Sequence, residues 1–116
     1  MKNSIAHMKA KAFAVRVVKF VKYLENEKHE YTLSKQMLRS GTSIGANLHE
    51  CINAQSKADF ISKLHIALKE ANETEYWLEL LCETDSITKT DFDDFQRKCV
   101  ELRRMLVSSV TTLKKK

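Results

Sequence analysis

Four histidines, three cysteines and one carboxylate among apolar residues are the side chains of this sequence best suited to chemistry. A di-iron carboxylate bundle requires Glu-x-x-His pairs that project into the core. None of the four histidines follows a glutamate at that spacing. The cysteines, Cys51, Cys82 and Cys99, lie far apart without a CxxC pair, which favours small buried residues in a reducing cytosol. We therefore expect no metal centre and no cofactor.

The carboxylate is Glu75, which lies between Ala71 and Leu78 on the apolar stripe of a predicted helix. A buried carboxylate needs a partner, because an unpaired charge in a core is strongly destabilising. We predict that Arg39 is this partner. A general acid or base would also need a nucleophile or an oxyanion donor, and the sequence places neither beside Glu75. A structural ion pair is thus the favoured interpretation, and no catalytic residue is assigned.

Two glycines, Gly41 and Gly45, lie inside a predicted helix. They do not form a phosphate-binding loop, because three residues separate them instead of four and no lysine follows. Each costs the helix about 1 kcal/mol relative to alanine. Being four residues apart, they share a face, and we predict that a neighbouring helix approaches closely there. A polar stripe on the same helix could hydrogen-bond to another helix or line a central channel; it comprises Gln36, Ser40, Ser43, Asn47 and Glu50.

Apolar residues recur at three- and four-residue spacing in four segments, which predicts helices over about 4–28, 32–55, 56–83 and 90–113. The absence of proline and the presence of only two glycines argue against a strand-rich fold. Ser56 and Asp59 resemble a capping box at the start of the third helix. Short connections between long helices predict an all-α, antiparallel up-down-up-down four-helix bundle, with residues 1–116 as one domain. No signal core or membrane-spanning run is present, so we expect a cytoplasmic protein.

Two of the predicted helices carry a second apolar stripe in addition to the one that faces the core. A helix that is apolar on two sides needs two partners, and the second can be another subunit. The second stripe of the first helix is interleaved with basic residues, whereas that of the third contains carboxylates. A head-to-tail ring would pair the two. The predicted interface comprises Ile5, Met8, Ala12 and Val15 on the first helix and Ile66, Glu70, Glu73, Trp77 and Leu80 on the third.

Charge is distributed unevenly along the chain, which has a net charge of +5. Residues 70–95 contain nine acidic residues and one basic residue, whereas the segments on either side are basic. This pattern fits either complementary surfaces within an assembly or a basic face for a polyanion. No nucleic-acid recognition motif is present, so nucleic-acid binding would act through phosphates. The candidate residues are Lys9, Arg16, Lys19, Arg97, Lys98, Arg103 and Arg104; ordinary solvated charge is the alternative.

Two long stretches resemble a known bacterial family. These are residues 36–50, QMLRSGTSIGANLHE, and residues 59–81, DFISKLHIALKEANETEYWLELL. The family comprises four-helix-bundle proteins encoded in intervening sequences of 23S ribosomal RNA genes, often labelled ribosomal-protein-like. The resemblance implies a bundle that assembles into a ring, typically a pentamer, without known enzymatic activity. The signature residues include Arg39, Ser40, Gly41, Ser43, Gly45, Asn47 and Glu50.

A related branch contains the accessory variability proteins of diversity-generating retroelements, which bind a reverse transcriptase and its RNA. The resemblance therefore implies three kinds of partner: other copies of the chain, RNA, and a reverse transcriptase. The sequence thus predicts a non-enzymatic oligomeric scaffold, a homopentamer by this resemblance, that binds nucleic acid or a nucleic-acid enzyme through a basic surface. The alternative is a protein-binding adaptor whose charged stripes serve only self-assembly.

Overall fold

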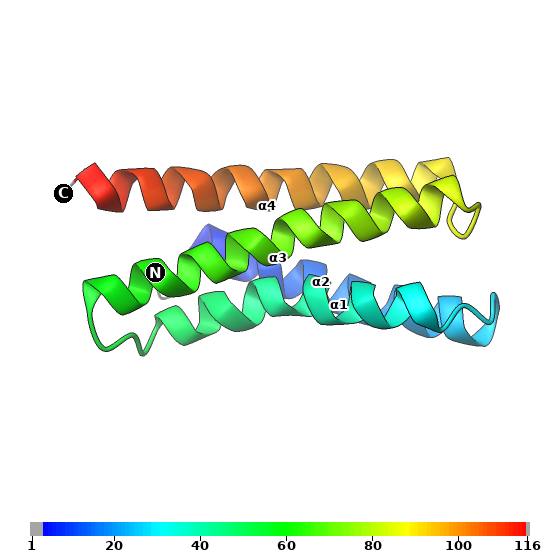
Figure 1. Ribbon diagram of the computed structural model, residues 1–116, viewed down its shortest axis with the longest axis horizontal. Coiled ribbons are helices and arrows are strands. Elements are labelled where there is room, and N and C mark those ends of the chain that lie inside the picture. The colour runs from blue at the N-terminus through cyan, green and yellow to red at the C-terminus, as the bar shows by residue number, and fades with distance from the viewer. Residues whose placement is uncertain (1–3, 116) are drawn as a thin grey trace.

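The computed structural model describes residues 4–115. The segments with helical spacing of apolar residues are helices, as the sequence predicts (Figure 1). Within this range no residue lies in a β-strand. The helices are α1 (Ile5–Asn26), α2 (Thr32–Cys51), α3 (Lys57–Glu83) and α4 (Lys89–Lys115). The prediction of an all-α, four-helix fold is therefore confirmed.

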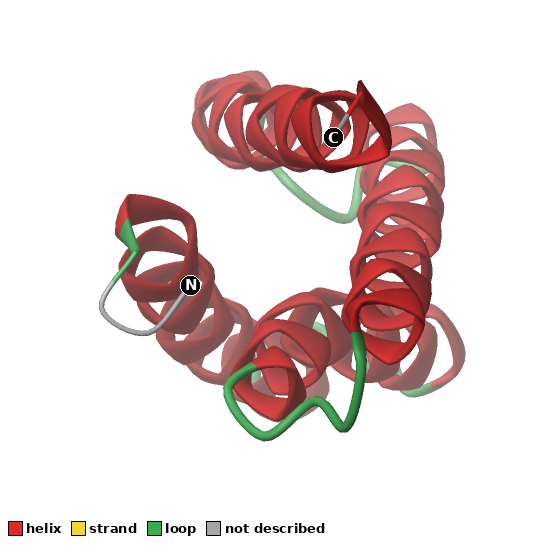
Figure 2. Ribbon diagram, turned by 90° about the vertical axis from the view of Figure 1, so that its left-hand side faces the viewer, coloured by secondary structure: helices red, strands yellow, loops and turns green. Residues whose placement is uncertain are grey.

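Short loops make consecutive helices antiparallel, so that α2 packs against α1 and α3, and α3 packs against α4 (Figure 1). The bundle measures 47 × 21 × 20 Å. A 27-residue helix is about 40 Å long at 1.5 Å per residue, so α3 and α4 set the long dimension. Helices α1 and α4 have less contact than the consecutive pairs, and the view along the bundle shows them as the most separated neighbours (Figure 2).

Capping interactions explain where α2 ends and α3 begins. The Ser56 hydroxyl accepts a hydrogen bond from the Asp59 N–H at 3.0 Å, and the Asp59 carboxylate accepts one from the Gln55 N–H at 3.1 Å. The predicted cap is thus present. Ser56 has an extended backbone, φ −159° and ψ 168°, which is incompatible with a helix reaching that point. The prediction that the second helix continues to Gln55 was wrong, because the chain leaves the helix after Cys51 to form this cap.

The hydrophobic core lies along the inner faces of all four helices. The inner face of α1 is buried, and the partly exposed Phe20 lies beside it; the buried residues are Ala6, Ala10, Phe13, Val17, Val21 and Leu24. Leu64, Ala71 and Leu78 of α3 are fully buried, as the spacing of apolar residues requires. In the described part of the chain, none of the helices is both long and apolar enough to cross a lipid bilayer.

Candidate functional site

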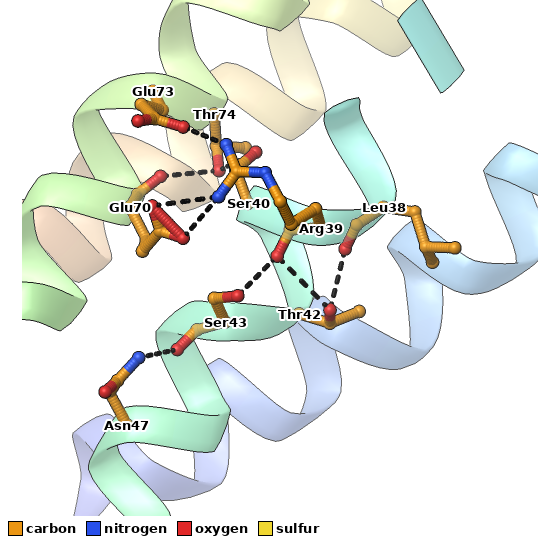
Figure 3. A network of polar contacts seen from close by, with 9 residues as sticks. All are labelled: Leu38, Arg39, Ser40, Thr42, Ser43, Asn47, Glu70, Glu73 and Thr74. Atoms are coloured by element: carbon orange, nitrogen blue, oxygen red, sulfur yellow. Dashed lines mark hydrogen bonds and ion pairs between the residues drawn. The ribbon is translucent and has the colours of Figure 1, made fainter. Parts of the chain in front are cut away.

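Arg39 joins α2 to α3 at the centre of the residues that carry the family resemblance (Figure 3). Its Nη1 atom lies 2.9 Å from Glu70 Oε2, and its Nη2 atom donates to the carboxylate of Glu73. The Glu70 side chain is only 8% exposed, whereas that of Arg39 is 49% exposed. Hydrogen bonding to Glu73, together with the charge of Glu70, raises the pKa of Arg39 and keeps it positive. The guanidinium therefore covers a buried carboxylate and faces solvent itself.

The predicted ion pair between Arg39 and Glu75 was wrong. Glu75 instead accepts a hydrogen bond from Arg103 Nε of α4 at 2.6 Å. Glu70 and Glu75 are five residues apart, which rotates their side chains by about 140° around the helix axis. Glu70 consequently faces α2, whereas Glu75 faces α4. The Glu75 side chain is also 18% exposed, so it lies at the edge of the core and not within it.

The polar stripe of α2 makes one buried contact with another helix. The hydroxyl groups of Ser40 and Thr74 lie 2.9 Å apart, and Thr74 also donates to the Glu70 carbonyl oxygen at 2.8 Å. Ser43 and Asn47 instead donate to backbone carbonyls of their own helix (Figure 3). The interhelical role predicted for the stripe thus applies to Ser40. At the end of the stripe, Glu50 forms a 3.5 Å ion pair with Lys63 of α3.

Both helix glycines lie against α1, as their spacing predicted. A β-carbon on Gly41 would be 2.9 Å from Val17 Cγ2, which is closer than such atoms normally approach. A β-carbon on Gly45 would be 3.4 Å from the backbone of Ala10, at the limit of ordinary contact. The two glycines therefore allow α1 and α2 to pack closely, and this packing sets the position of α1.

Two buried serines on α2 differ in their hydrogen bonding, and this difference predicts opposite effects of the same substitution. Ser34 and Ser40 are both fully buried, but the Ser34 hydroxyl has no hydrogen-bond partner within residues 4–115. We expect Ser34→Ala to raise the free energy of unfolding by about 0.5–1 kcal/mol, since it removes an unsatisfied hydroxyl and favours the helix. Ser40→Ala should lower it by about 1–2 kcal/mol. Urea unfolding of both variants tests this, and equal effects would contradict the assignment.

Most of the basic residues proposed for nucleic-acid binding form ion pairs along the line where α1 meets α4, here called the α1–α4 seam. Lys9 pairs with Glu101 at 3.0 Å. Asp94 contacts three cations: Arg16, Arg97 at 2.6 Å, and Lys98 at 3.7 Å. The hydrogen bond from Arg16 is the main cause of a lowered pKa of Asp94, which therefore remains ionised. A shallow groove of about 210 Å³ lies along this seam, lined by Lys9, Ala12, Phe13, Arg16, Lys98, Glu101 and Leu102.

Only two of the seven proposed basic residues have no ion-pair partner among residues 4–115. These are Lys19 and Arg104, and both are exposed. Arg103 is occupied by Glu75, so its charge stabilises the bundle. The seam as a whole has four cations that share the two carboxylates Asp94 and Glu101, which leaves it positively charged.

The two halves of the proposed subunit interface differ in exposure. On α1, Ile5 and Met8 are each 64% exposed, Val15 is 47% exposed and Ala12 is exposed; we call these four residues the α1 outer face. On α3, Ile66 is 39% exposed, but Glu70 is buried, and Glu73, Trp77 and Leu80 are partly buried. The carboxylates of that stripe bind Arg39 of the same chain, because α2 covers this side of α3.

Two ion pairs within α4 could have been predicted from the spacing of residues in the sequence. Asp94 precedes Arg97 by three residues and Lys98 by four, and such pairs face each other on a helix. The pairing of Arg16 with Asp94, and the position of Arg16 4.6 Å from the centre of the Phe95 ring, depend on how α1 and α4 pack.

In the described residues, no group of three or more histidine, cysteine, aspartate or glutamate side chains is arranged to hold a metal ion.

Comparison with known proteins agrees with this architecture. The family described as 23S rRNA-intervening sequence protein matches residues 2–108. A crystal structure of a protein of unknown function from the S23 ribosomal protein family of Bacteroides thetaiotaomicron is 53% identical, with a TM-score of 0.90. The similarity covers 91% of this chain and 98% of that protein. No curated protein matches the sequence.

Proposed function

Because the chain belongs to the family of 23S rRNA-intervening sequence proteins, we propose that it is a non-enzymatic scaffold that assembles into a ring-shaped homo-oligomer through the α1 outer face. The exposure of that face is the observation that carries this proposal. Ile5, Met8 and Val15 follow one another at helical spacing, and all are at least 47% exposed. A contiguous apolar surface of this kind on a soluble domain is typical of a protein interface.

The polar chemistry of the bundle also favours a scaffold over an enzyme. Of the carboxylates that form ion pairs within residues 4–115, Glu70 and Glu75 have the least exposed side chains, 8% and 18%, and both are bound by arginine. In the described part of the chain, neither has a nucleophilic side chain among its hydrogen-bond partners. Their ion pairs join α3 to α2 and to α4, which holds three helices in register.

Substitution of the α1 outer face tests the assembly. We expect Met8→Glu combined with Val15→Glu to convert the oligomer to a 13.4 kDa monomer, because each carboxylate would be buried in an apolar interface. The matched control is Val107→Glu on α4, since Val107 is 44% exposed and lies outside this face. Light scattering measures the mass. A wild-type monomer at all concentrations would overturn the proposal. If the double variant had the same mass as the wild type, the interface would not lie on the α1 outer face.

RNA binding is a second candidate function, favoured by the excess of cations along the α1–α4 seam and by the exposed Lys19 and Arg104 on the same two helices. Such binding would be phosphate-driven and would weaken steeply with salt. We expect Lys19→Glu with Arg104→Glu to reduce RNA affinity and the salt dependence of binding, because these exposed cations have no partners within residues 4–115. Arg103 is unsuitable for this test, because its loss would disturb Glu75. Fluorescence anisotropy with a labelled RNA at two salt concentrations is the measurement, and binding that is insensitive to salt would exclude this function.

A further inference from the structure

Two histidines meet where the first turn of α1 lies beside the last turn of α2. His7 Nε2 and His49 Nδ1 are 3.3 Å apart, although the residues are 42 positions apart in the sequence. The ring centroids are separated by 5.5 Å, and the ring planes are inclined by 25°. His49 is exposed and His7 is partly exposed, so solvent reaches this pair. The antiparallel packing of α1 and α2 creates this juxtaposition, which the spacing of the histidines in the sequence does not indicate.

The separation of the two nitrogens matches that of two imidazoles bound to one ion. Zinc binds imidazole nitrogen at about 2.0–2.1 Å in tetrahedral geometry, which places two bound nitrogens about 3.3–3.4 Å apart. We propose that His7 and His49 form a two-histidine site for a borderline divalent transition metal such as Zn²⁺, Ni²⁺ or Cu²⁺. Imidazole is a preferred ligand for these ions, whereas Mg²⁺ and Ca²⁺ prefer oxygen. Water completes the coordination at this exposed position.

Proton positions change when the metal binds. In the metal-free protein, one of the two facing nitrogens donates its hydrogen to the other. A metal ion needs a lone pair on both, so the donating ring moves its proton to its other nitrogen, a change of tautomer without net proton release. Both rings must be neutral, because each supplies a lone pair to the ion, so protons compete with the metal for the site.

Among residues 4–115, the polar side chains that follow His49 are engaged with other groups, which leaves the two imidazoles as the ligands. Cys51 follows His49 by two residues, but it is only 3% exposed and its thiol lies 3.8 Å from the carbonyl oxygen of Phe60. Glu50 is paired with Lys63 at 3.5 Å. A metal held by His7 and His49 would tie the start of α1 to the end of α2, and would thereby stabilise the end of the helix that carries the α1 outer face.

Calorimetric titration of tag-free protein with ZnCl₂ and with NiCl₂ tests the site. Each experiment uses a Cys82→Ser background, since Cys82 is a partly exposed free thiol. We expect one ion to bind per chain, and we expect His7→Gln or His49→Gln to weaken binding at least about tenfold, a difference of about 1.4 kcal/mol. His65→Gln, which alters an exposed histidine on α3, is the matched control and should bind as before.

NMR spectroscopy and thermal unfolding test the position of the metal independently of the measured affinity. Addition of Zn²⁺ should shift the side-chain NMR signals of His7 and His49 but not those of His65, and it should raise the midpoint of thermal unfolding. The histidine variants are expected to fold normally, since both side chains reach the surface, and circular dichroism checks this. Absence of binding to the wild-type histidines would overturn the proposal. So would unchanged affinity in both histidine variants, which would place the metal elsewhere.

Discussion

Gly41→Leu is expected to lower the free energy of unfolding by about 3 kcal/mol, because the site has no room for a side chain. Even a β-carbon would be 2.9 Å from Val17 Cγ2. Val17 is fully buried and branched at its β-carbon, so it cannot rotate away cheaply. The substitution removes a helix-interior glycine, which returns about 1 kcal/mol, and the overpacking exceeds this gain. Urea denaturation provides the free energy.

Matched substitutions separate the steric effect from helix propensity. Ala46→Leu adds a leucine at an exposed position of the same helix and should change the free energy of unfolding by less than about 0.5 kcal/mol. Gly45→Ala should be close to neutral, because its β-carbon would lie 3.4 Å from the Ala10 backbone and the helix gains stability. A stable Gly41→Leu variant would mean that α1 and α2 do not pack closely.

Arg39→Ala is the second substitution with a large expected effect. Removal of the guanidinium leaves Glu70, whose side chain is only 8% exposed, without its charged partner. We expect the free energy of unfolding to fall by about 2 kcal/mol. The loss is smaller than for a fully buried pair, because water reaches the carboxylate once the arginine side chain is gone. Thermal or urea unfolding at neutral pH measures the change.

Two further variants assign this loss to the ion pair. Glu70→Gln in the Arg39→Ala background should restore part of the stability, because an amide is less costly to bury than a charge. Arg97→Ala is the control: Arg97 is 73% exposed and its partner Asp94 keeps Arg16, so the loss should stay below about 0.5 kcal/mol. Equal losses for the two arginines would show that burial of Glu70 has no energetic consequence.

The agreement between sequence and structure is closest where neighbours along the chain decide the outcome. Helix positions follow from apolar spacing, and the Ser56 cap follows from two residues three positions apart. The close approach at Gly41 and Gly45 also follows from local pattern, since a costly glycine pair on one helix face indicates contact with another backbone. The family resemblance is likewise contained in two continuous stretches and agrees with the match over residues 2–108.

Partner choice between helices was beyond the sequence. The periodicity of α3 shows that Glu70 and Glu75 lie on different flanks, but not which flank faces α2 and which faces α4, because both hands of a four-helix bundle bury the same stripes. Arg39 and Arg103 are both arginines, so residue type did not show which of them pairs with Glu75. The contacts between His7 and His49, and between Arg16 and Asp94, likewise depend on the relative placement of helices. The sequence determined the helices, their caps and their apolar faces through local interactions; only the tertiary structure decided which charges meet, since that depends on how the helices are arranged in space.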